Sequence, residues 1–356
     1  MIKKFIKNNF SKRIISWQIS NGRKNLPWQK TNDPYHIWLS EIMLQQTQVS
    51  VVIPYFHRFL EKFPDLNSLA KTDLNDVMLL WSGLGYYRRA KNLHLCAKKI
   101  VSENKGYFPS QKKLLQNLPG IGISTAGAIA VFAFGKRESI LDGNVKRVMC
   151  RNFGIEGYPR NVKVEKKLWD LAENLLPSNN IKIYTQGLMD LGAMVCIRGV
   201  PKCNICPLSD KCIALKDNRI KELPFKKQKK IIEKFKIMFI FLHNDLILLE
   251  KKPIDGVWGG LFSFPEISYI NTSEELAFKK FLKNTSFGVI KEFEKLSKVE
   301  CRFTHYSQTI LPIKVSLSKK YKIINNLLYK WVKIKTLNQE PLPSPIRKIT
   351  DSLEKL

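Results

Sequence analysis

Four of the seven cysteines of this 356-residue chain lie in one short segment, which points to metal chemistry. An odd number of cysteines cannot be fully paired within one chain, and such crowding is typical of a metal site. The spacing C-x6-C-x2-C-x5-C, with a single C-x-x-C, suits a four-iron, four-sulfur cluster at least as well as tetrahedral zinc. These candidate ligands are Cys196, Cys203, Cys206 and Cys212. The cysteines that stand alone are expected to be small buried apolar side chains; they are Cys96, Cys150 and Cys301.

Two carboxyl groups could serve acid–base chemistry. Glu41 lies in the apolar stretch W-L-S-E-I-M-L, where shielding from water would raise its pKa and suit it to act as a general acid. The alternative is a solvent-facing Glu, or a capping carboxylate paired with Ser40. Asp142, in I-L-D-G-N-V-K-R-V, enters a basic helix, where an Asp most often caps the N-terminus. The polar run at positions 45–48 (Q-Q-T-Q) favours contact with unpaired base edges.

A glycine-rich turn could bind phosphate. In L-P-G-I-G, Gly120 and Gly122 would let backbone N–H groups approach a phosphate, and the small-residue helix after Ser124 would add its positive dipole end. This pattern predicts a helix-hairpin-helix DNA anchor at about residues 112–141. Taken by itself, such a sequence is most often only a turn.

The charge favours a polyanionic partner. The chain has 60 Lys and Arg against 30 Asp and Glu, a formal charge of +30, and nucleic acid is the commonest partner of such a protein. Abundant Lys, Ile, Asn and Phe also fit compositional drift, so the charge locates no site. No apolar run is long enough to cross a bilayer. The basic N-terminus lacks the apolar stretch of a signal peptide, so we expect a cytoplasmic, nucleoid-associated protein, with an organelle-targeting helix as the alternative.

The pattern of apolar residues changes along the chain. Helical spacing from 10 to about 220 predicts an all-α unit, and a charged stretch at 217–232 predicts a linker. Beyond it, two apolar runs flanking His243 to Asp245 predict a β-hairpin. The second unit is therefore expected to mix α and β. Its other predicted strands are 297–303, 308–317 and 328–334, and its predicted helices are 273–284 and 345–355.

Together these motifs resemble the adenine DNA glycosylases of the MutY family, in the helix-hairpin-helix base-excision superfamily. The resemblance runs from about Gly22 to Cys212 through L-P-W-Q, W-L-S-E-I-M-L-Q-Q-T-Q-V, G-L-G-Y-Y-R-R-A, L-P-G-I-G-I-S-T-A-G-A-I, I-L-D-G-N-V-K-R-V and M-D-L-G-A-M-V-C. It implies an all-α glycosylase domain at 1–216, in which the loop 196–212 holds one 4Fe–4S cluster. After the linker at 217–232, a Nudix-like α+β domain is expected at 233–356.

The resemblance also implies roles for single residues. Glu41 matches the acid that protonates the leaving adenine, and Asp142 matches the carboxylate that stabilises the oxocarbenium-like sugar. Gln46 and Tyr86 match residues around the extruded base and the opposing purine. Ser124 stands where strand-cleaving relatives such as endonuclease III place a Schiff-base lysine, so the strand should survive base removal.

The C-terminal part is similar to the Nudix-like domain of the same family. G-V-W-G-G-L-F-S-F-P, at Gly256 to Pro265, carries this likeness, while the glutamates that would bind a catalytic metal are missing. Recognition rather than hydrolysis is therefore expected. Phe303, Thr304 and His305 match a Phe-Ser-His loop that reads oxidised guanine, with Thr replacing Ser.

The sequence thus predicts a monomeric, monofunctional glycosylase that acts on duplex DNA. Its expected substrate is adenine mispaired with 8-oxoguanine or guanine. One rival is an endonuclease III-like enzyme with lyase activity on oxidised pyrimidines. The other is a non-catalytic iron–sulfur protein that only binds DNA.

Overall fold

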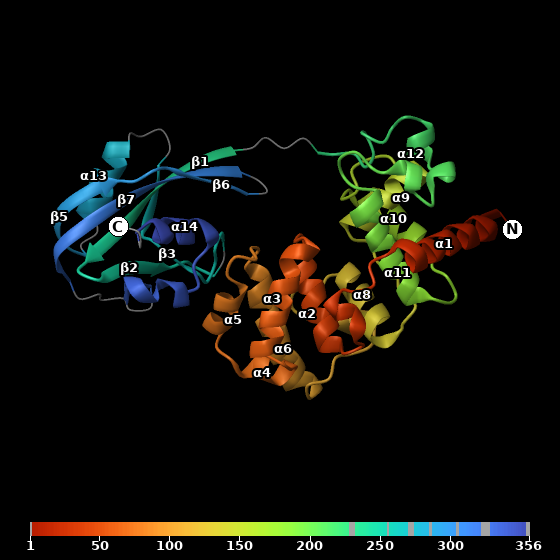
Figure 1. The fold of residues 1–356 in the computed structure, drawn as a ribbon, viewed down its shortest axis with the longest axis horizontal. Helices are drawn as coiled ribbons and strands as arrows, with labels where there is room; N and C mark the ends of the chain where they lie inside the picture. The colour runs from red at the N-terminus through yellow and green to blue at the C-terminus, as the bar shows by residue number, and fades with distance from the viewer. Residues whose placement is uncertain are drawn as a thin grey trace. The chain divides into compact units, whose positions relative to one another are not determined.

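The computed structural model describes residues 2–227, 232–254, 256–269, 274–284, 287–303, 306–321 and 328–353. The chain forms two compact units (Figure 1). The first comprises Met1–Lys71 and Asn92–Gln228, and the second comprises Thr72–Lys91 and Lys229–Leu356. Residues 72–91 fall within the range predicted for the helical domain, yet they group with the C-terminal sheet.

The first unit is helical, as the apolar spacing predicted. Ile14 of α1, Met149 of α9 and Leu188 of α11 belong to one buried core that joins its helices. Gly135 and Gly154 end α8 and α9 in the left-handed conformation that glycine adopts readily. Its helices are α1 (Ile2–Asn21), α2 (Pro34–Leu44), α3 (Val49–Lys62), α4 (Leu66–Lys71), α6 (Arg88–Asn104, which begins in the second unit), α7 (Lys112–Gln116), α8 (Ile123–Phe134), α9 (Gly143–Phe153), α10 (Val162–Asn174), α11 (Ile181–Asp190) and α12 (Ile213–Lys216).

The second unit contains a mixed sheet in the order β3-β2-β1-β7-β5, with β4 beside β1, β6 beside β7 and β8 beside β2. β1 and β7 run parallel, and the other described pairs run antiparallel. Phe239 of β1 stacks on Phe281 of α13 with ring centroids 3.9 Å apart. The elements are α5 (Leu74–Trp81), β1 (Ile232–His243), β2 (Leu246–Lys251), β3 (Phe262–Ser263), β4 (Glu266–Tyr269), α13 (Glu274–Asn284), β5 (Gly288–Lys295), β6 (Val299–Arg302), β7 (Tyr306–Lys320), β8 (Tyr329–Lys333) and α14 (Ser344–Leu353).

The predicted hairpin is confirmed, because His243 pairs with Leu246 across a turn in which Asn244 has a φ of 54°. The three further strands and two helices predicted for this unit are also present. Three strands were not predicted. β3 has only two residues, β4 only four, and β5 is an edge strand whose side chains are almost all exposed, so it lacks the usual apolar alternation.

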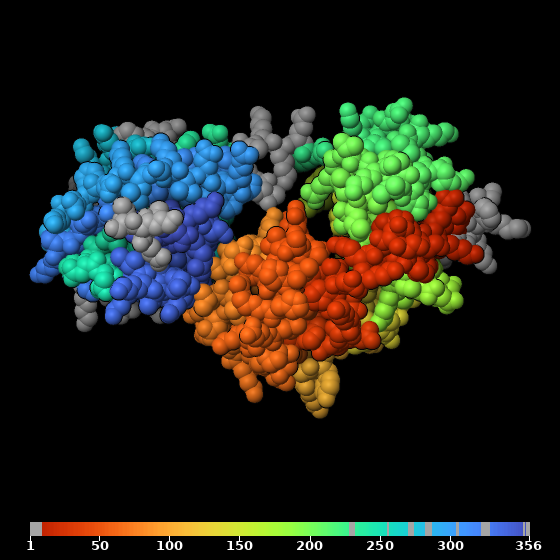
Figure 2. Space-filling model, viewed as in Figure 1, coloured from red at the N-terminus to blue at the C-terminus, as the bar shows by residue number. Residues whose placement is uncertain are grey.

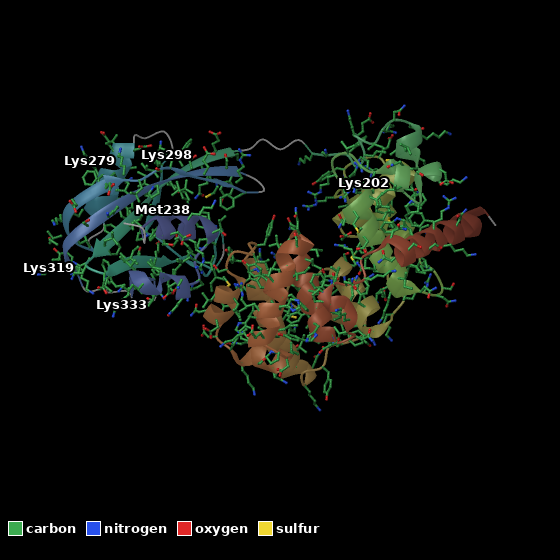
Figure 3. All side chains as sticks on the ribbon, in the orientation of Figure 1. Lys202, Met238, Lys279, Lys298, Lys319 and Lys333 are labelled. Carbon is green, nitrogen blue, oxygen red and sulfur yellow. The ribbon has the colours of Figure 1, made fainter. Side chains whose placement is uncertain are left out.

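The lone cysteines and the lysines lie as their types predict. Cys96, Cys150 and Cys301 are buried. Surface lysines occur on both units and include Lys202, Lys279, Lys298, Lys319 and Lys333 (Figure 3). Among the described residues, no helix combines the length and apolarity needed to cross a bilayer.

Candidate active site and cysteine loop

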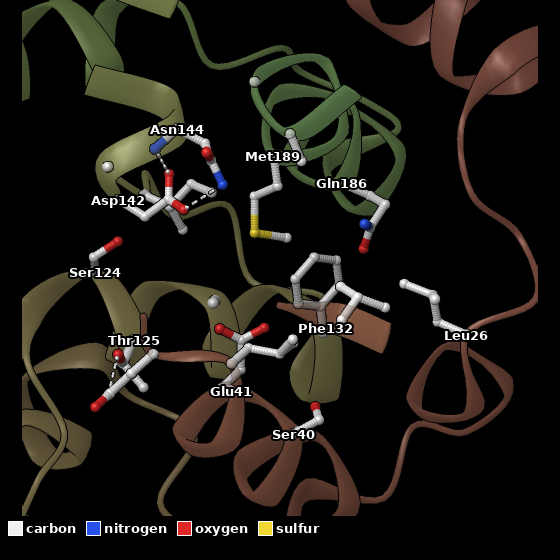
Figure 4. Close-up of a pocket in the computed structure, with 18 of the residues that line it drawn as sticks. Leu26, Ser40, Glu41, Ser124, Thr125, Phe132, Asp142, Asn144, Gln186 and Met189 are labelled. Atoms are coloured by element: carbon white, nitrogen blue, oxygen red, sulfur yellow. Dashed lines mark hydrogen bonds between the residues drawn. The ribbon is translucent and has the colours of Figure 1, made fainter. Parts of the chain in front are cut away.

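A cavity of about 1570 Å³ opens in the first unit, and two predicted catalytic acids line it. Glu41 reaches it from α2, and Asp142 reaches it from the start of α9 (Figure 4). The sequence alone could not show that these two residues converge, because they are far apart in the chain. The other predicted residues on its wall are Gln46, Gly120, Gly122 and Ser124.

Glu41 lies in the second half of α2. Asp33 caps this helix by accepting from the Tyr35 N–H (2.8 Å), and Pro34 occupies its first position, which fixes where α2 begins. Burial raises the pKa of Glu41 to about 8, and the charge of Asp142 adds to the rise. Glu41 therefore holds a proton at neutral pH. Ser40, the capping partner considered above, donates instead to the carbonyl of Ile37 (2.8 Å).

Asp142 is both an N-cap and a wall of the cavity. Its Oδ1 accepts from the backbone N–H groups of Asn144 (3.0 Å) and Val145 (2.8 Å), and its Oδ2 accepts from Asn144 Nδ2 (3.3 Å). Burial raises the pKa of Asp142, while these hydrogen bonds and the charge of Arg147 act against the rise. The donors therefore favour the ionised form of this carboxyl group.

The glycine turn joins α7 to α8. Gly120 has a φ of 78°, and a Cβ there would lie 2.8 Å from Asn92 Cβ, so a side chain is excluded. Gly122 is exposed and is the N-cap of α8, where no side chain forms a capping hydrogen bond, and a Cβ built at this glycine would have no heavy atom within 4 Å. Ser124 Oγ accepts from the Leu141 N–H (3.0 Å). Ser124 thus fixes the residue directly before Asp142.

The other predicted DNA contacts belong to different units. Gln46 is exposed, has a φ of 62° and lines the cavity. Tyr86, with a φ of 50°, belongs to the second unit. Phe303 also lies there, at the end of β6, with its ring stacked 4.6 Å from that of Tyr306. The predicted contacts Thr304 and His305 lie outside the described residues.

The four loop cysteines are partly buried and form no disulfide. Burial raises the pKa of the Cys206 thiol to about 11, and the charges of the other three cysteines add to the rise. By its chemistry, a donor set of four thiols is one that an iron–sulfur cluster takes. Across the described ranges, no group of three or more His, Cys, Asp or Glu side chains is itself arranged to hold a metal ion.

Helix α1 braces the cysteine loop. Arg13 forms an ion pair with Asp210 and donates to the Pro207 carbonyl (3.3 Å). Figure 2 shows this helix, in red, against the green segment that carries the loop. Beyond the loop, the Leu223 carbonyl accepts from Arg151 Nε (2.9 Å), so the chain stays packed on α9 past α12.

Helix α9 bonds the start of the cysteine loop to Asp142. Arg147 donates to the Cys196 carbonyl (2.6 Å) and the Gly192 carbonyl (2.6 Å), and also to Asn144 Oδ1 (2.9 Å). The same Asn144 side chain donates to Asp142 Oδ2 (3.3 Å). One continuous set of hydrogen bonds thus connects the backbone of a candidate metal ligand with a candidate catalytic carboxylate.

One residue that shapes the cavity was not singled out from the sequence. Asp190 is fully buried and accepts from Gln18 (3.1 Å), from Gln186 (2.8 Å), and from the backbone N–H (2.8 Å) and Nε (2.9 Å) of Arg23. Gln18, Arg23 and Gln186 line the cavity, so Asp190 fixes this wall from behind. Two of its donors, Gln18 and Arg23, are more than 160 residues away in the chain, so no local sequence pattern predicts these contacts.

A helix-hairpin-helix turn beside a cavity with two acids defines a DNA-repair glycosylase fold. Residues 39–174 match the HhH-GPD superfamily of base excision DNA repair proteins, and residues 237–352 match the NUDIX domain. The chain is 41% identical, over 344 residues, to the adenine DNA glycosylase of Buchnera aphidicola subsp. Schizaphis graminum, covering 96% of this chain and 98% of that protein. This chain belongs to the adenine DNA glycosylase family.

Solved structures agree with this fold. A thermostable thymine-DNA glycosylase superposes with a TM-score of 0.55 at 31% identity, covering 59% of this chain and 97% of that one. An endonuclease III in a non-covalent DNA complex gives a TM-score of 0.51 at 19% identity, over 61% of this chain and 98% of that one. The second likeness concerns the fold alone.

Proposed function

We propose that this protein hydrolyses the N-glycosidic bond of adenine mispaired with 8-oxoguanine or guanine in duplex DNA. The observation that carries the proposal is the pair of acids on one cavity: Glu41 has a pKa of about 8, whereas Asp142 is surrounded by donors that favour its charge. Two carboxyl groups with opposite surroundings can divide the roles of acid and charge stabiliser.

In the proposed mechanism, the adenine first leaves the base stack and enters the cavity. This extrusion costs a few kcal/mol and is easiest at a mispair. Protonated Glu41 donates its proton to a ring nitrogen of adenine, because neutral adenine leaves far more easily than its anion. The Asp142 carboxylate offsets the positive charge that grows on the sugar, and water completes the hydrolysis.

Ser124 supports a reaction that stops at base removal. A lyase needs an amine that can form a Schiff base with the sugar. The Ser124 hydroxyl cannot form one, and it is engaged with the Leu141 N–H. We therefore favour a monofunctional glycosylase over the endonuclease III-like rival.

The DNA contacts are proposed from both units. The open backbone at Gly122 and the start of α8 suit a phosphate, and Gln46 lies on the cavity wall near the position proposed for the base. Tyr86 is proposed to lie beside the opposing purine. Phe303, with Thr304 and His305, would read 8-oxoguanine in the opposite strand.

We also propose the domain boundaries and the cofactor. The glycosylase domain would comprise residues 1–216, the linker 217–232, and the recognition domain 233–356. The loop 196–212 would hold one 4Fe–4S cluster, which would order the loop between its four thiolate ligands. Purified protein should then contain iron and acid-labile sulfide, and a colourless protein that contains zinc and no iron would overturn the assignment.

Adenine release tests the proposed reaction. Duplexes with A opposite 8-oxoguanine should yield free adenine, with strand breaks only after alkali. Glu41→Gln should abolish this release. The matched control is Glu61→Gln, which makes the same change at an exposed position of α3 and should act like the unaltered protein. No adenine from the unaltered protein, or full release by Glu41→Gln, would refute the proposal.

A further inference from the structure

The turn that presents Tyr86 is held in an uncommon conformation. It follows α5, and Tyr86 is 46% exposed with a φ of 50°. A non-glycine residue at positive φ persists where its surroundings determine it. Here Trp81 Nε1 and Arg89 NH2 both donate to the Gly85 carbonyl, each at 3.1 Å. The Arg89 guanidinium also lies 5.3 Å from the centre of the Tyr86 ring.

The turn comprises residues 82–86, and its first residue, Ser82, is hydrogen-bonded to residues near the C-terminus. Ser82 Oγ donates to the Leu342 carbonyl (2.5 Å) and accepts from Arg347 Nε (3.2 Å). Arg347, on α14, also donates from NH2 to the Glu340 carbonyl (3.0 Å). A single hydroxyl is therefore used both as a donor and as an acceptor, and its acceptor bond comes from a charged group.

A second contact lies at the other end of α5. Lys251 Nζ, at the end of β2, donates to Asn75 Oδ1 (3.3 Å). The helix before the Tyr86 turn is thus bonded at its first turn and directly after its last residue to parts of the same unit. This arrangement agrees with the grouping of residues 72–91 with the C-terminal sheet.

We propose that Ser82 and Arg347 are positioning residues that set the Tyr86 turn for DNA, so that the C-terminal part of the chain controls how Tyr86 meets the mispair. The inference rests on the proposed function, which places Tyr86 beside the opposing purine. Only three residues separate Ser82 from Tyr86, so a displaced Ser82 would move the ring. This positioning would act through a tertiary contact, because Ser82 and Arg347 are 265 residues apart in the sequence.

A double-mutant cycle tests whether Arg347 acts through Tyr86. Arg347→Ala and Tyr86→Ala should each lower the single-turnover rate on A:8-oxoguanine by about 10-fold, and the double variant should be no slower than Tyr86→Ala. Multiplied losses in the double variant would mean independent action and would overturn the inference. If Arg347 only stabilised the fold, its loss in rate would likewise multiply with the loss caused by Tyr86→Ala.

Matched variants separate the bond from the charge. Lys348→Ala removes a positive charge from an exposed position of the same helix and should leave the rate unchanged. Ser82→Thr keeps the hydroxyl and should retain activity, whereas Ser82→Ala should behave like Arg347→Ala. A loss with Lys348→Ala equal to that with Arg347→Ala would assign the effect to charge and contradict the proposal.

Hydrogen exchange gives a readout that needs no catalysis. In the full chain without DNA, Arg347→Ala should speed amide exchange in residues 83–89 and leave β1 and β7 unchanged. If the unaltered protein releases adenine while Arg347→Ala changes neither rate nor exchange, the positioning role is wrong and the proposed function stands. If no adenine is released, the proposed function is wrong, and faster exchange at 83–89 would still support the bond from α14.

Discussion

The start of α9 and the second half of α2 face the same cavity, and burial raises the pKa of the carboxyl group at each, but hydrogen-bond donors oppose the rise at the start of α9. At the start of α9, two backbone N–H groups and the Asn144 amide donate to Asp142. Within α2 the backbone N–H groups are already used by the helix, so Glu41 gains burial without such donors, and its pKa rises to about 8. Position along a helix thus gives Asp142 hydrogen-bond donors that oppose the effect of burial on its pKa, although both residues have the same functional group.

Replacing either acid should have the largest effect on adenine release. Glu41→Gln and Asp142→Ala should each slow adenine release by about 100- to 10,000-fold, the range for a lost acid–base or charge-stabilising group. Their stabilities should move in opposite directions. At pH 8 Glu41→Gln should unfold at a higher temperature than the unaltered protein. Asp142→Ala should lower the free energy of unfolding by about 1 kcal/mol, because it removes the N-cap of α9.

Asp142→Asn serves as the control for this pair, because Asn still caps a helix but carries no charge. It should be as inactive as Asp142→Ala and nearly as stable as the unaltered protein. Equal destabilisation by both substitutions would mean that the carboxylate, rather than the cap, stabilises the start of α9.

The pH dependence should follow Glu41. Because the acid must be protonated, kcat/KM should fall above about pH 8, by about tenfold for each further pH unit. Stability should change at lower pH than the rate, since the unfolded chain releases this proton near its ordinary pKa of 4.5 and the folded chain near 8. The contribution of Glu41 to stability therefore decreases as the pH rises between these values. Denaturant titrations of the unaltered protein at several pH values should show this decrease in the free energy of unfolding. The same titrations of Glu41→Gln should lack the contribution of this group.

Asn144→Ala should have a smaller effect. It removes the side-chain bond to Asp142 Oδ2 and leaves both backbone bonds to Oδ1, so the pKa of Asp142 should rise further. We expect a loss of about 3- to 10-fold near neutral pH, consistent with one hydrogen bond to a charged group. The acidic limb of the rate profile should also move to higher pH. A loss that is the same at every pH would instead assign Asn144 a purely structural role.

Ser124→Ala should have the smallest effect of the set. It leaves the Leu141 N–H without its acceptor, which should destabilise the loop before Asp142 by about 1 kcal/mol. Adenine release should decrease by no more than a few-fold. A much larger loss, at unchanged stability, would indicate that the hydroxyl takes part in the reaction.

Local patterns in the sequence predicted much of this structure. The apolar spacing indicated the helical unit, and two apolar runs flanking a short turn indicated the hairpin of β1 and β2. The cap at Asp142 was expected from the residue type alone, and it is confirmed. Each of these features depends on neighbours in the chain, which is why spacing reveals them.

Contacts between distant residues could not be predicted in this way. Asp190 gathers donors from Gln18, Arg23 and Gln186, and only folding brings them together. Residues 72–91 also group with the C-terminal sheet, and the bond between Ser82 and Arg347 in that unit joins residues that show no spacing signal either. The exposed edge strand β5 was not predicted because its outward side chains lack apolar alternation.

The three buried lone cysteines have a practical consequence for handling the protein. Burial raises the pKa of Cys96 to about 12 and that of Cys150 to about 11, and it also raises the pKa of Cys301. Thiols that are hidden and protonated react slowly with alkylating reagents. Burial also raises the pKa of the loop thiols, that of Cys206 to about 11, so the difference lies in exposure. The loop cysteines are only partly buried, and the first uptake of a thiol label by the folded protein should therefore come from the loop at 196–212. Counting labelled cysteines would then measure, without spectroscopy, the fraction of molecules whose loop thiols are unprotected.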